Sequence, residues 1–167
     1  MTRLPVLDAR IDERVRATRD ANPWWPCARG CDHCCRSLPR LPEITEAEWA
    51  RLAAAVAQLG RSTSVEVVER VRRAASDEAP LVCPLLDRER GACLVYEARP
   101  IACRTYGFYT ERDGSLCCSK VTEAVRANAS DPEGVVWGNG EAVKHDMREL
   151  GLVRSLADWL DIRPPGK

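Results

Sequence analysis

The chain has 167 residues, and its 25 basic and 25 acidic side chains leave a formal net charge of zero. A balanced charge gives no overall cationic field of the kind that nucleic-acid binding uses, so we expect no nucleic-acid partner. No stretch approaches the roughly 20 consecutive apolar residues that span a bilayer, which argues against a membrane protein. The length predicts a single cysteine-cluster domain over 1–167, with a core at 24–119 and a helical tail at 120–162.

The first predicted element is an amphipathic helix over 7–21, where Leu7, Ile11 and Val15 recur at helical spacing among charged residues. The residues before it contain no apolar core of signal-peptide length and no cleavage-site pattern. This absence predicts a cytoplasmic location, where a reducing environment keeps thiols free.

Two capping boxes predict the next two helices. Thr45 with Glu48 opens a helix that Gly60 ends, and Thr63 with Glu66 opens another. Both are followed by apolar residues at helical spacing, so each helix should bury one face.

The helical pattern is interrupted over 81–120, where proline, glycine and five cysteines occur together. We expect a short hairpin over 106–118 that turns at the favoured pair Asp113 and Gly114. This is the irregular part of the chain, and it carries many of the candidate ligands.

Helix is expected again over 121–128 and from 140 to about 159, with a break at Gly151. The whole pattern predicts a mainly α fold. We expect a small irregular helical domain, with loops and a short hairpin, organised around a cysteine-ligated metal site.

Cysteine content is the most informative feature of the chain. An odd number of cysteines leaves at least one outside any set of disulfides, and adjacent cysteines cannot easily bridge each other. In a reducing compartment, clustered thiols are more often metal ligands or catalytic groups than structural bridges. The nine cysteines are Cys27, Cys31, Cys34, Cys35, Cys83, Cys93, Cys103, Cys117 and Cys118.

The first four cysteines could converge in either of two local structures. A helix over 27–35 would place all four on one face, and a loop that turns into a helix near Cys31 would gather them equally well. Neighbouring side chains on a helix point about 100° apart, so the Cys34–Cys35 pair should rarely serve one tetrahedral site. One of the two could ligate while the other supports it, or the two could face two metals or bridge a binuclear or cluster site. The Cys117–Cys118 pair raises the same question.

Arginines follow the cysteines closely, at Arg29, Arg36, Arg99 and Arg104. Four thiolates around a zinc ion, or around an iron–sulfur core of charge two plus, leave a net charge of about −2 that guanidinium groups can offset. We therefore expect Arg99 and Arg104 to lie beside the bound group. The alternative is that these arginines pair with carboxylates, as Arg99 could with Glu97.

The two histidines give weaker signals. His33 lies inside the first cluster, where it could replace a thiolate or lie at the surface. His145, between Lys144 and Asp146 on an expected helix, is predicted to be solvated. With only two histidines and no Gly-x-Ser-x-Gly motif, the sequence does not support a hydrolase.

The cysteine spacing resembles that of a known family. The pattern is Cys27-x3-Cys31-x2-Cys34-Cys35, then Cys83-Pro84-x-Leu86, then Cys93-x-Val95-Tyr96-x2-Arg99-Pro100-x2-Cys103-Arg104-x-Tyr106. It is similar to the YkgJ-type cysteine-cluster family, a zinc- or iron-chelating domain with a CxxCxxCC signature. The chain departs from that signature in its first interval, which has three residues rather than two.

The resemblance implies that a metal ion is the ligand of this protein. It implies zinc, iron or an iron–sulfur cluster as the cofactor, and it implies these metal ligands: Cys27, Cys31, Cys34, Cys35, Cys83, Cys93 and Cys103, with Cys117 or Cys118 added. A metal-chelating protein is the main hypothesis. The alternatives are an iron–sulfur-dependent redox or protein-modification enzyme and an interaction module in which zinc stabilises a thin core. The sequence identifies no protein partner.

Overall fold

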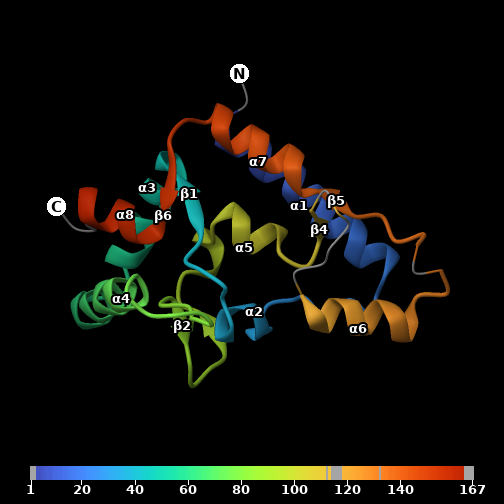
Figure 1. The fold of residues 1–167 in the computed structure, drawn as a ribbon, viewed down its shortest axis with the longest axis horizontal. Coiled ribbons are helices and arrows are strands. Elements are labelled where there is room, and N and C mark those ends of the chain that lie inside the picture. The colour runs from blue at the N-terminus through green and yellow to red at the C-terminus, as the bar shows by residue number, and fades with distance from the viewer. Residues whose placement is uncertain (1–2, 112, 114–117, 132, 164–167) are drawn as a thin grey trace.

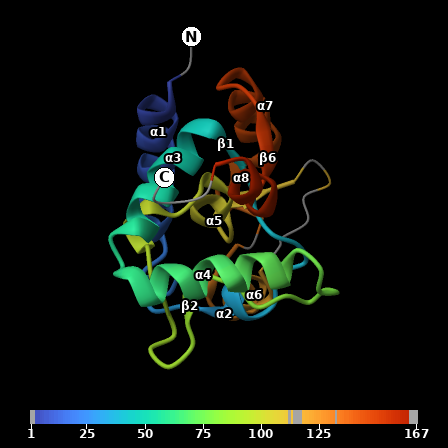
Figure 2. The ribbon, with the colours of Figure 1, turned by 90° about the vertical axis from the view of Figure 1, so that its left-hand side faces the viewer.

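A computed structural model describes residues 3–111, 113, 118–131 and 133–163. Helices dominate this part of the chain, joined by short two-stranded sheets (Figures 1 and 2), which confirms the mainly α fold class. Within the same ranges, no helix is both long and apolar enough to cross a bilayer. In chain order the elements are α1 (Leu4–Ala21), α2 (His33–Arg36), β1 (Glu43–Thr45), α3 (Glu46–Ala57), α4 (Arg61–Ala74), β2 (Leu86–Asp87), β3 (Ala92–Cys93), the 3-10 helix η1 (Tyr96–Ala98), α5 (Ile101–Thr105), β4 (Tyr109–Thr110), α6 (Ser119–Asn128), β5 (Gly138–Asn139), α7 (Gly140–Glu149), β6 (Val153–Ser155) and α8 (Leu156–Ile162).

The first two predicted helices are present. Helix α1 begins earlier than expected, at Leu4. The proline in its first turn is tolerated because a backbone N–H at that position would have no partner within the helix. The capping box at the start of α3 is confirmed. The backbone N–H of Glu48 donates to Thr45 Oγ1 at 3.3 Å, and the N–H of Thr45 donates to the Glu48 carboxylate at 2.9 Å.

The second predicted capping box is wrong. Helix α4 begins at Arg61, before Thr63, and no side chain caps it. Its N-cap is Gly60, whose φ of +87° favours glycine, so the sharp turn at this residue starts the helix early. The Ser64 hydroxyl donates to the carbonyl of Val56 at 2.6 Å, which ties the start of α4 to α3.

The first arm of the expected hairpin pairs elsewhere. Strand β4 runs parallel to β5, with Tyr109 opposite Gly138, while the expected turn at Gly114 lies outside the described residues. A Cβ on Gly138 would lie 2.4 Å from the Tyr109 ring, so only glycine permits this pairing. An antiparallel hairpin does form, between β2 and β3.

The expected break at Gly151 is confirmed. Helix α7 ends at Glu149, and strand β6 then pairs antiparallel with β1, far earlier in the chain, before α8 begins. A capping box formed by Ser155 and Asp158 starts α8. The tail therefore folds back onto the region around α3.

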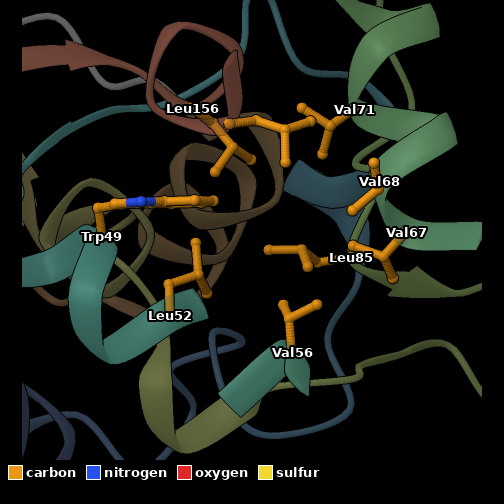
Figure 3. A pocket seen from close by; sticks show the side chains of 9 residues that line it. Trp49, Leu52, Val56, Val67, Val68, Val71, Leu85 and Leu156 are labelled. Atoms are coloured by element: carbon orange, nitrogen blue, oxygen red, sulfur yellow. The ribbon is translucent and has the colours of Figure 1, made fainter. Parts of the chain in front are cut away.

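Three clusters of buried side chains hold the elements together. The largest lies where α3, α4 and α8 meet (Figure 3), and it includes Trp49, Leu52, Val67, Val71 and Leu156. The second surrounds the start of α6, and it includes Trp25, Phe108, Cys118, Val121 and Val125. The third joins α1, α5 and α7, and it includes Leu7, Ile11, Ile101, Val143 and Met147. Cys83 and Cys93 pack against the first cluster, and Cys27 packs against the second, to which Cys118 belongs.

Candidate metal centre

A cavity of about 340 Å³ lies between α1, the loop before α2, the η1–α5 segment and the start of α6. Five cysteines line it, and we call them the cavity thiols: Cys27, Cys31, Cys34, Cys103 and Cys118. The cavity therefore brings together cysteines from the first cluster and from the second half of the chain.

Hydrogen bonds fix the loop that carries Cys27. The Arg19 side chain donates to the Cys27 carbonyl from Nε at 3.2 Å and from Nη2 at 2.7 Å. Trp25 Nε1 donates to the carbonyl of Gly107 at 3.2 Å. Gly107 has a φ of +80°, and an added Cβ would lie 3.3 Å from Val121 Cγ2, so glycine is suited to this position beside Cys27. Helix begins only at His33, so the loop alternative holds for the first cluster.

The other three described cysteines, Cys35, Cys83 and Cys93, do not line the cavity, and we call them the core-side thiols. Cys83 and Cys93 pack against the largest apolar cluster. The N–H of Cys83 donates to the Cys35 carbonyl at 2.7 Å, which joins the first cluster to the segment before β2. All eight described cysteines are free thiols, and Cys117 lies outside the described residues.

Cys34 and Cys35 connect the two groups. Their Sγ atoms lie 3.9 Å apart, although neighbouring helical side chains were expected to diverge. The expectation fails because the angle between the Cα–Cβ bonds does not fix the sulfur positions, which rotation about χ1 can bring together. This separation is close to the spacing of about 3.8 Å between two sulfurs on one tetrahedral zinc, given a Zn–S bond of about 2.3 Å.

The cavity thiols Cys27, Cys34 and Cys103 favour the protonated state. Burial, followed by the charges of the neighbouring Cys31, Cys34 and Cys118, raises the pKa of Cys27 to about 12, against a lowering effect of Arg19. Burial also raises the pKa of Cys103. A hydrogen bond with Cys35, followed by burial, raises the pKa of Cys34. A metal that binds here would therefore have to displace protons, so its affinity would rise with pH.

Two of the core-side thiols, Cys35 and Cys93, also favour the protonated state. The hydrogen bond with Cys34 lowers the pKa of Cys35, but a hydrogen bond with Cys83 and burial outweigh it and raise the pKa to about 12. Burial raises the pKa of Cys93, against a hydrogen bond from the Val95 backbone and the charge of Arg99.

The arginines near the cysteines divide into paired and unpaired groups. Arg29 Nη1 lies 3.1 Å from Glu97, and Arg36 Nε lies 2.6 Å from Asp32, so both follow the ion-pair alternative. The suggested pair between Arg99 and Glu97 does not form. Arg99 instead lies over the Tyr96 ring, with its guanidinium carbon 3.6 Å from the ring centroid. Among the described residues, Arg99 has no carboxylate partner.

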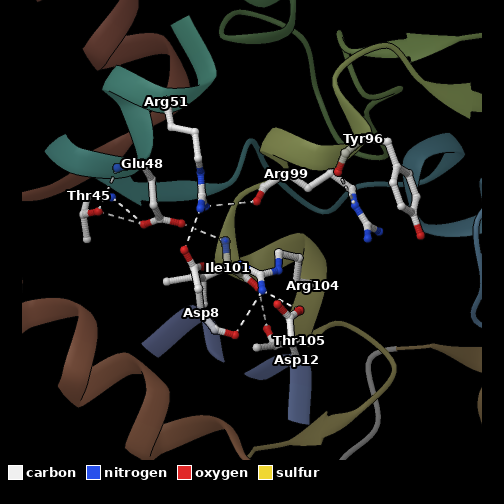
Figure 4. A network of polar contacts seen from close by, with 10 residues as sticks. All are labelled: Asp8, Asp12, Thr45, Glu48, Arg51, Tyr96, Arg99, Ile101, Arg104 and Thr105. Carbon is white, nitrogen blue, oxygen red and sulfur yellow. Dashed lines mark hydrogen bonds and ion pairs between the residues drawn. The ribbon is translucent and has the colours of Figure 1, made fainter. Parts of the chain in front are cut away.

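Arg104 also lines the cavity but binds carboxylates of α1 (Figure 4). It forms ion pairs with Asp8 and with Asp12, the second at 2.6 Å. Asp8 also accepts from Arg51 of α3, at 2.6 Å. Burial lowers the pKa of Arg104, but the hydrogen bond to Asp12 and the charge of Asp8 raise it overall. Asp8 of α1, which pairs with both arginines, therefore joins α1, α3 and α5 at one wall of the cavity.

Sequence reasoning missed the wall that α1 supplies. Asp8, Asp12, Val15 and Arg19 all line the cavity, and their spacing of four, three and four residues places them on one face of the helix. This stripe runs beside the apolar face that contains Leu7. Paired acidic residues next to an apolar face were the available signal, but such a stripe is usually only solvated.

The histidines behave differently from each other. His33 lines the cavity, where its Nε2 lies 3.0 Å from Ser119 Oγ. His145 is exposed on α7, as expected.

Among the described ranges, no three His, Cys, Asp or Glu side chains stand in an arrangement that could hold one metal ion. The cavity thiols thus have the chemistry of a soft-metal site.

The fold and the clustered free thiols define a small helical metal-binding protein. A family model named CxxCxxCC, with the description "Putative zinc- or iron-chelating domain", matches residues 26–133. The chain belongs to this family, which confirms the resemblance seen in its cysteine spacing. Comparisons with curated proteins and with solved structures found no match.

Proposed function

We propose that this protein holds an iron–sulfur cluster in the cavity, with ligands drawn from the cavity thiols. Thiolate sulfur is the ligand that iron–sulfur clusters require, and five cysteines line this one cavity. When bound, such a cluster would supply redox or Lewis-acid chemistry. The protein residues bind and orient it and offset its charge. The free thiols also fit a reducing cytoplasm as the location.

The number of thiols that line one cavity carries this proposal. Sulfurs that bind one zinc ion lie about 3.8 Å apart, whereas sulfurs that bind different irons of a cluster are held apart by its irons and sulfides. In the described part of the chain, no three ligand side chains are placed for a single ion, although five thiols line one cavity. A centre larger than one ion fits that arrangement better.

The charges around the cavity support the same reading. A cubane of charge two plus with four thiolates carries about −2. Two cavity arginines, Arg19 and Arg99, have no ion pair among the described residues. The charge of Arg19 lowers the pKa of Cys27, against burial, and that of Arg99 lowers the pKa of Cys103, against burial. Two free cations therefore lie beside a centre that needs about two positive charges.

A zinc site is the second candidate, and the Cys34–Cys35 spacing favours it. Their Sγ separation of 3.9 Å matches one edge of a zinc tetrahedron. Cys83 also interacts with Cys35 by a hydrogen bond. In this alternative, zinc would use Cys34 and the core-side thiols, and the cavity would stay free of metal.

Metal analysis of two matched variants separates the candidates. The protein is purified without oxygen, and iron, acid-labile sulfide, zinc and the visible spectrum are measured for the wild type, Cys31→Ser and Cys83→Ser. Cys31 lines the cavity and Cys83 does not, so each variant removes one thiol from one group only. For the iron–sulfur cluster, we expect brown wild-type protein and Cys83→Ser protein that keeps most of its iron. Cys31→Ser should lose most of its iron.

Zinc at about one ion per chain in colourless protein would support the second candidate, provided that Cys83→Ser loses it and Cys31→Ser keeps it. Neither iron nor zinc in the wild type would contradict the proposed function. Melting curves for each variant, recorded alongside, show whether a loss of metal merely follows from unfolding.

A further inference from the structure

Arg99 is held in place by contacts that leave its terminal nitrogens unused. Its Nε donates to the Tyr96 carbonyl at 3.0 Å, and its guanidinium stacks on the Tyr96 ring. No hydrogen bond to a described residue reaches either terminal nitrogen, Nη1 or Nη2, and Figure 4 shows no dashed line at them. The charge-offsetting role proposed above uses only the positive charge of Arg99, not these donors.

The same residue borders the cavity, whose other walls are partly aromatic. Tyr96, Tyr106 and Phe108 line it together with Val15. Its volume of about 340 Å³ lies within the range of about 300–1,000 Å³ that is common for small-molecule sites. Such sites combine apolar walls with a few fixed polar groups, and this cavity has both.

We propose that this cavity binds a small carboxylic acid with an apolar or aromatic body, and that the two terminal nitrogens of Arg99 hold its carboxylate. A planar guanidinium fork matches the two oxygens of a carboxylate, and charge-assisted pairs of this kind are among the stronger hydrogen bonds. The stacking on Tyr96 fixes the fork before the ligand arrives, which lowers the entropy lost on binding. This inference goes beyond the proposed function, because neither the fork nor the aromatic walls require a metal.

The other arginines of the cavity are less suited to this role. Arg51 and Arg104 are already paired with Asp8. Arg19 uses two of its nitrogens on the Cys27 carbonyl and lies over the Phe108 ring, 5.3 Å from its centroid. Arg99 thus keeps both terminal nitrogens available where the other three cavity arginines do not.

The experiment measures benzoate binding by titration calorimetry in a buffer free of carboxylate and phosphate. Benzamide is the neutral comparison, and acetate and inorganic phosphate are oxyanions without an aromatic body. The variants are Arg99→Gln, Arg99→Lys and, as a matched control, Arg29→Lys. Arg29 also lies over the Tyr96 ring, 4.8 Å from its centroid, but it pairs with Glu97 and does not line the cavity. Iron, sulfide and zinc are measured in every sample.

Wild type and Arg29→Lys should bind benzoate equally, and at least about tenfold more tightly than benzamide or acetate. Arg99→Gln should weaken benzoate binding about tenfold or more. Arg99→Lys should also bind benzoate more weakly than the wild type, because an ammonium lacks the fork.

Several results would overturn the carboxylate site. One is that the wild type does not bind benzoate, and another is that both Arg99 variants bind benzoate as tightly as the wild type does. The others are that the wild type binds benzamide as tightly as benzoate, or binds phosphate through Arg99 more tightly than benzoate. Metal-free wild type is titrated as well, because benzoate that binds only to metal-loaded protein would be a metal ligand and would also overturn the proposal. If the wild type as purified without oxygen holds neither iron nor zinc but binds benzoate through Arg99, the carboxylate site is upheld while the proposed function is contradicted.

Discussion

The cavity thiols and the core-side thiols are held by different kinds of packing. Cys83 and Cys93 rest on the largest apolar cluster, where α3, α4 and α8 bury their apolar faces against one another. Cys27 and Cys118 rest on a smaller cluster around Trp25 and Phe108. Much of the cavity wall is polar, built from arginines, carboxylates and thiols.

This difference indicates which region needs a bound group. Apolar burial is the main favourable contribution to folding, and it can hold the core side together without help. Buried thiols and charges around a cavity contribute less on their own, and a metal can supply the missing stabilisation. We therefore expect metal to matter most for the loop before α2 and for the start of α6.

Removing the metal should have the largest effect, and a local one. After chelation under reducing, anaerobic conditions, we expect hydrogen-exchange protection to fall about ten-thousandfold or more for amides at 27–36 and 118–122, because a structural metal contributes on the order of 10 kcal/mol. Amides of α3 and α8 should change far less, because their apolar contacts remain. Mass-spectrometric hydrogen exchange on metal-loaded and metal-free protein measures both. An equal loss over the whole chain would break the comparison between the two regions.

Truncation of the apolar core should come next in size. Leu52 is 1% exposed in α3, and Leu52→Ala should lower the free energy of unfolding by about 2–5 kcal/mol by removing buried methyl groups and leaving a cavity. Urea unfolding measures the change. The control is Val65→Ala on α4, because Val65 is 52% exposed and its loss should have almost no effect. Folded Leu52→Ala protein should keep its metal, and a loss of metal would show that the two regions are coupled.

The link between the regions is predicted to be smaller but measurable. Buried Glu48 accepts from the Ile101 N–H at 2.7 Å and from Thr45, so it fixes the start of α5, which carries Cys103. Glu48→Gln should lower the free energy of unfolding by about 1–3 kcal/mol, because it removes a charged acceptor from a buried site.

The matched control is Asp158→Asn, which changes the carboxylate of the exposed capping box that begins α8. Its effect should be smaller, because water can replace a lost hydrogen bond there. Urea unfolding of both variants makes the comparison. Equal losses would mean that the burial of Glu48 and its bond to α5 add nothing.

The smallest effect is a pH dependence of the metal-free protein. The pKa of Cys27 is raised to about 12, chiefly by burial, above the ordinary thiol value of 9.0. A raised pKa stabilises the folded state below pH 9, and this contribution is lost as the pH rises from about 9 towards 12. Near pH 10 the loss should be about 1 kcal/mol for this thiol.

Melting temperatures of reduced, metal-free protein measured from about pH 8 to pH 10 report this loss. Cys27→Ala should show a shallower decline than the wild type, because it lacks one of the titrating thiols. A melting temperature that stays constant over this range would contradict the role of burial at Cys27.

The sequence by itself determined the local features of this protein. Helical periodicity gave α1, the pair Thr45 and Glu48 gave the start of α3, and Gly151 gave the break after α7. These signals work because they involve residues within about one or two turns of each other. The cysteine spacing also indicated the family and its metal-binding character, because that spacing is written directly in the chain.

The tertiary structure alone decided which cysteines share a cavity and what forms its walls. Arg104 lies 96 residues from its partner Asp8, and no local pattern reports such a contact. The early start of α4 at Gly60 and the pairing of β4 with β5 were missed for a related reason, since both depend on contacts made after the chain has folded back on itself. Spacing along a chain specifies the side chains on one helix face, whereas a cavity depends on how distant segments pack.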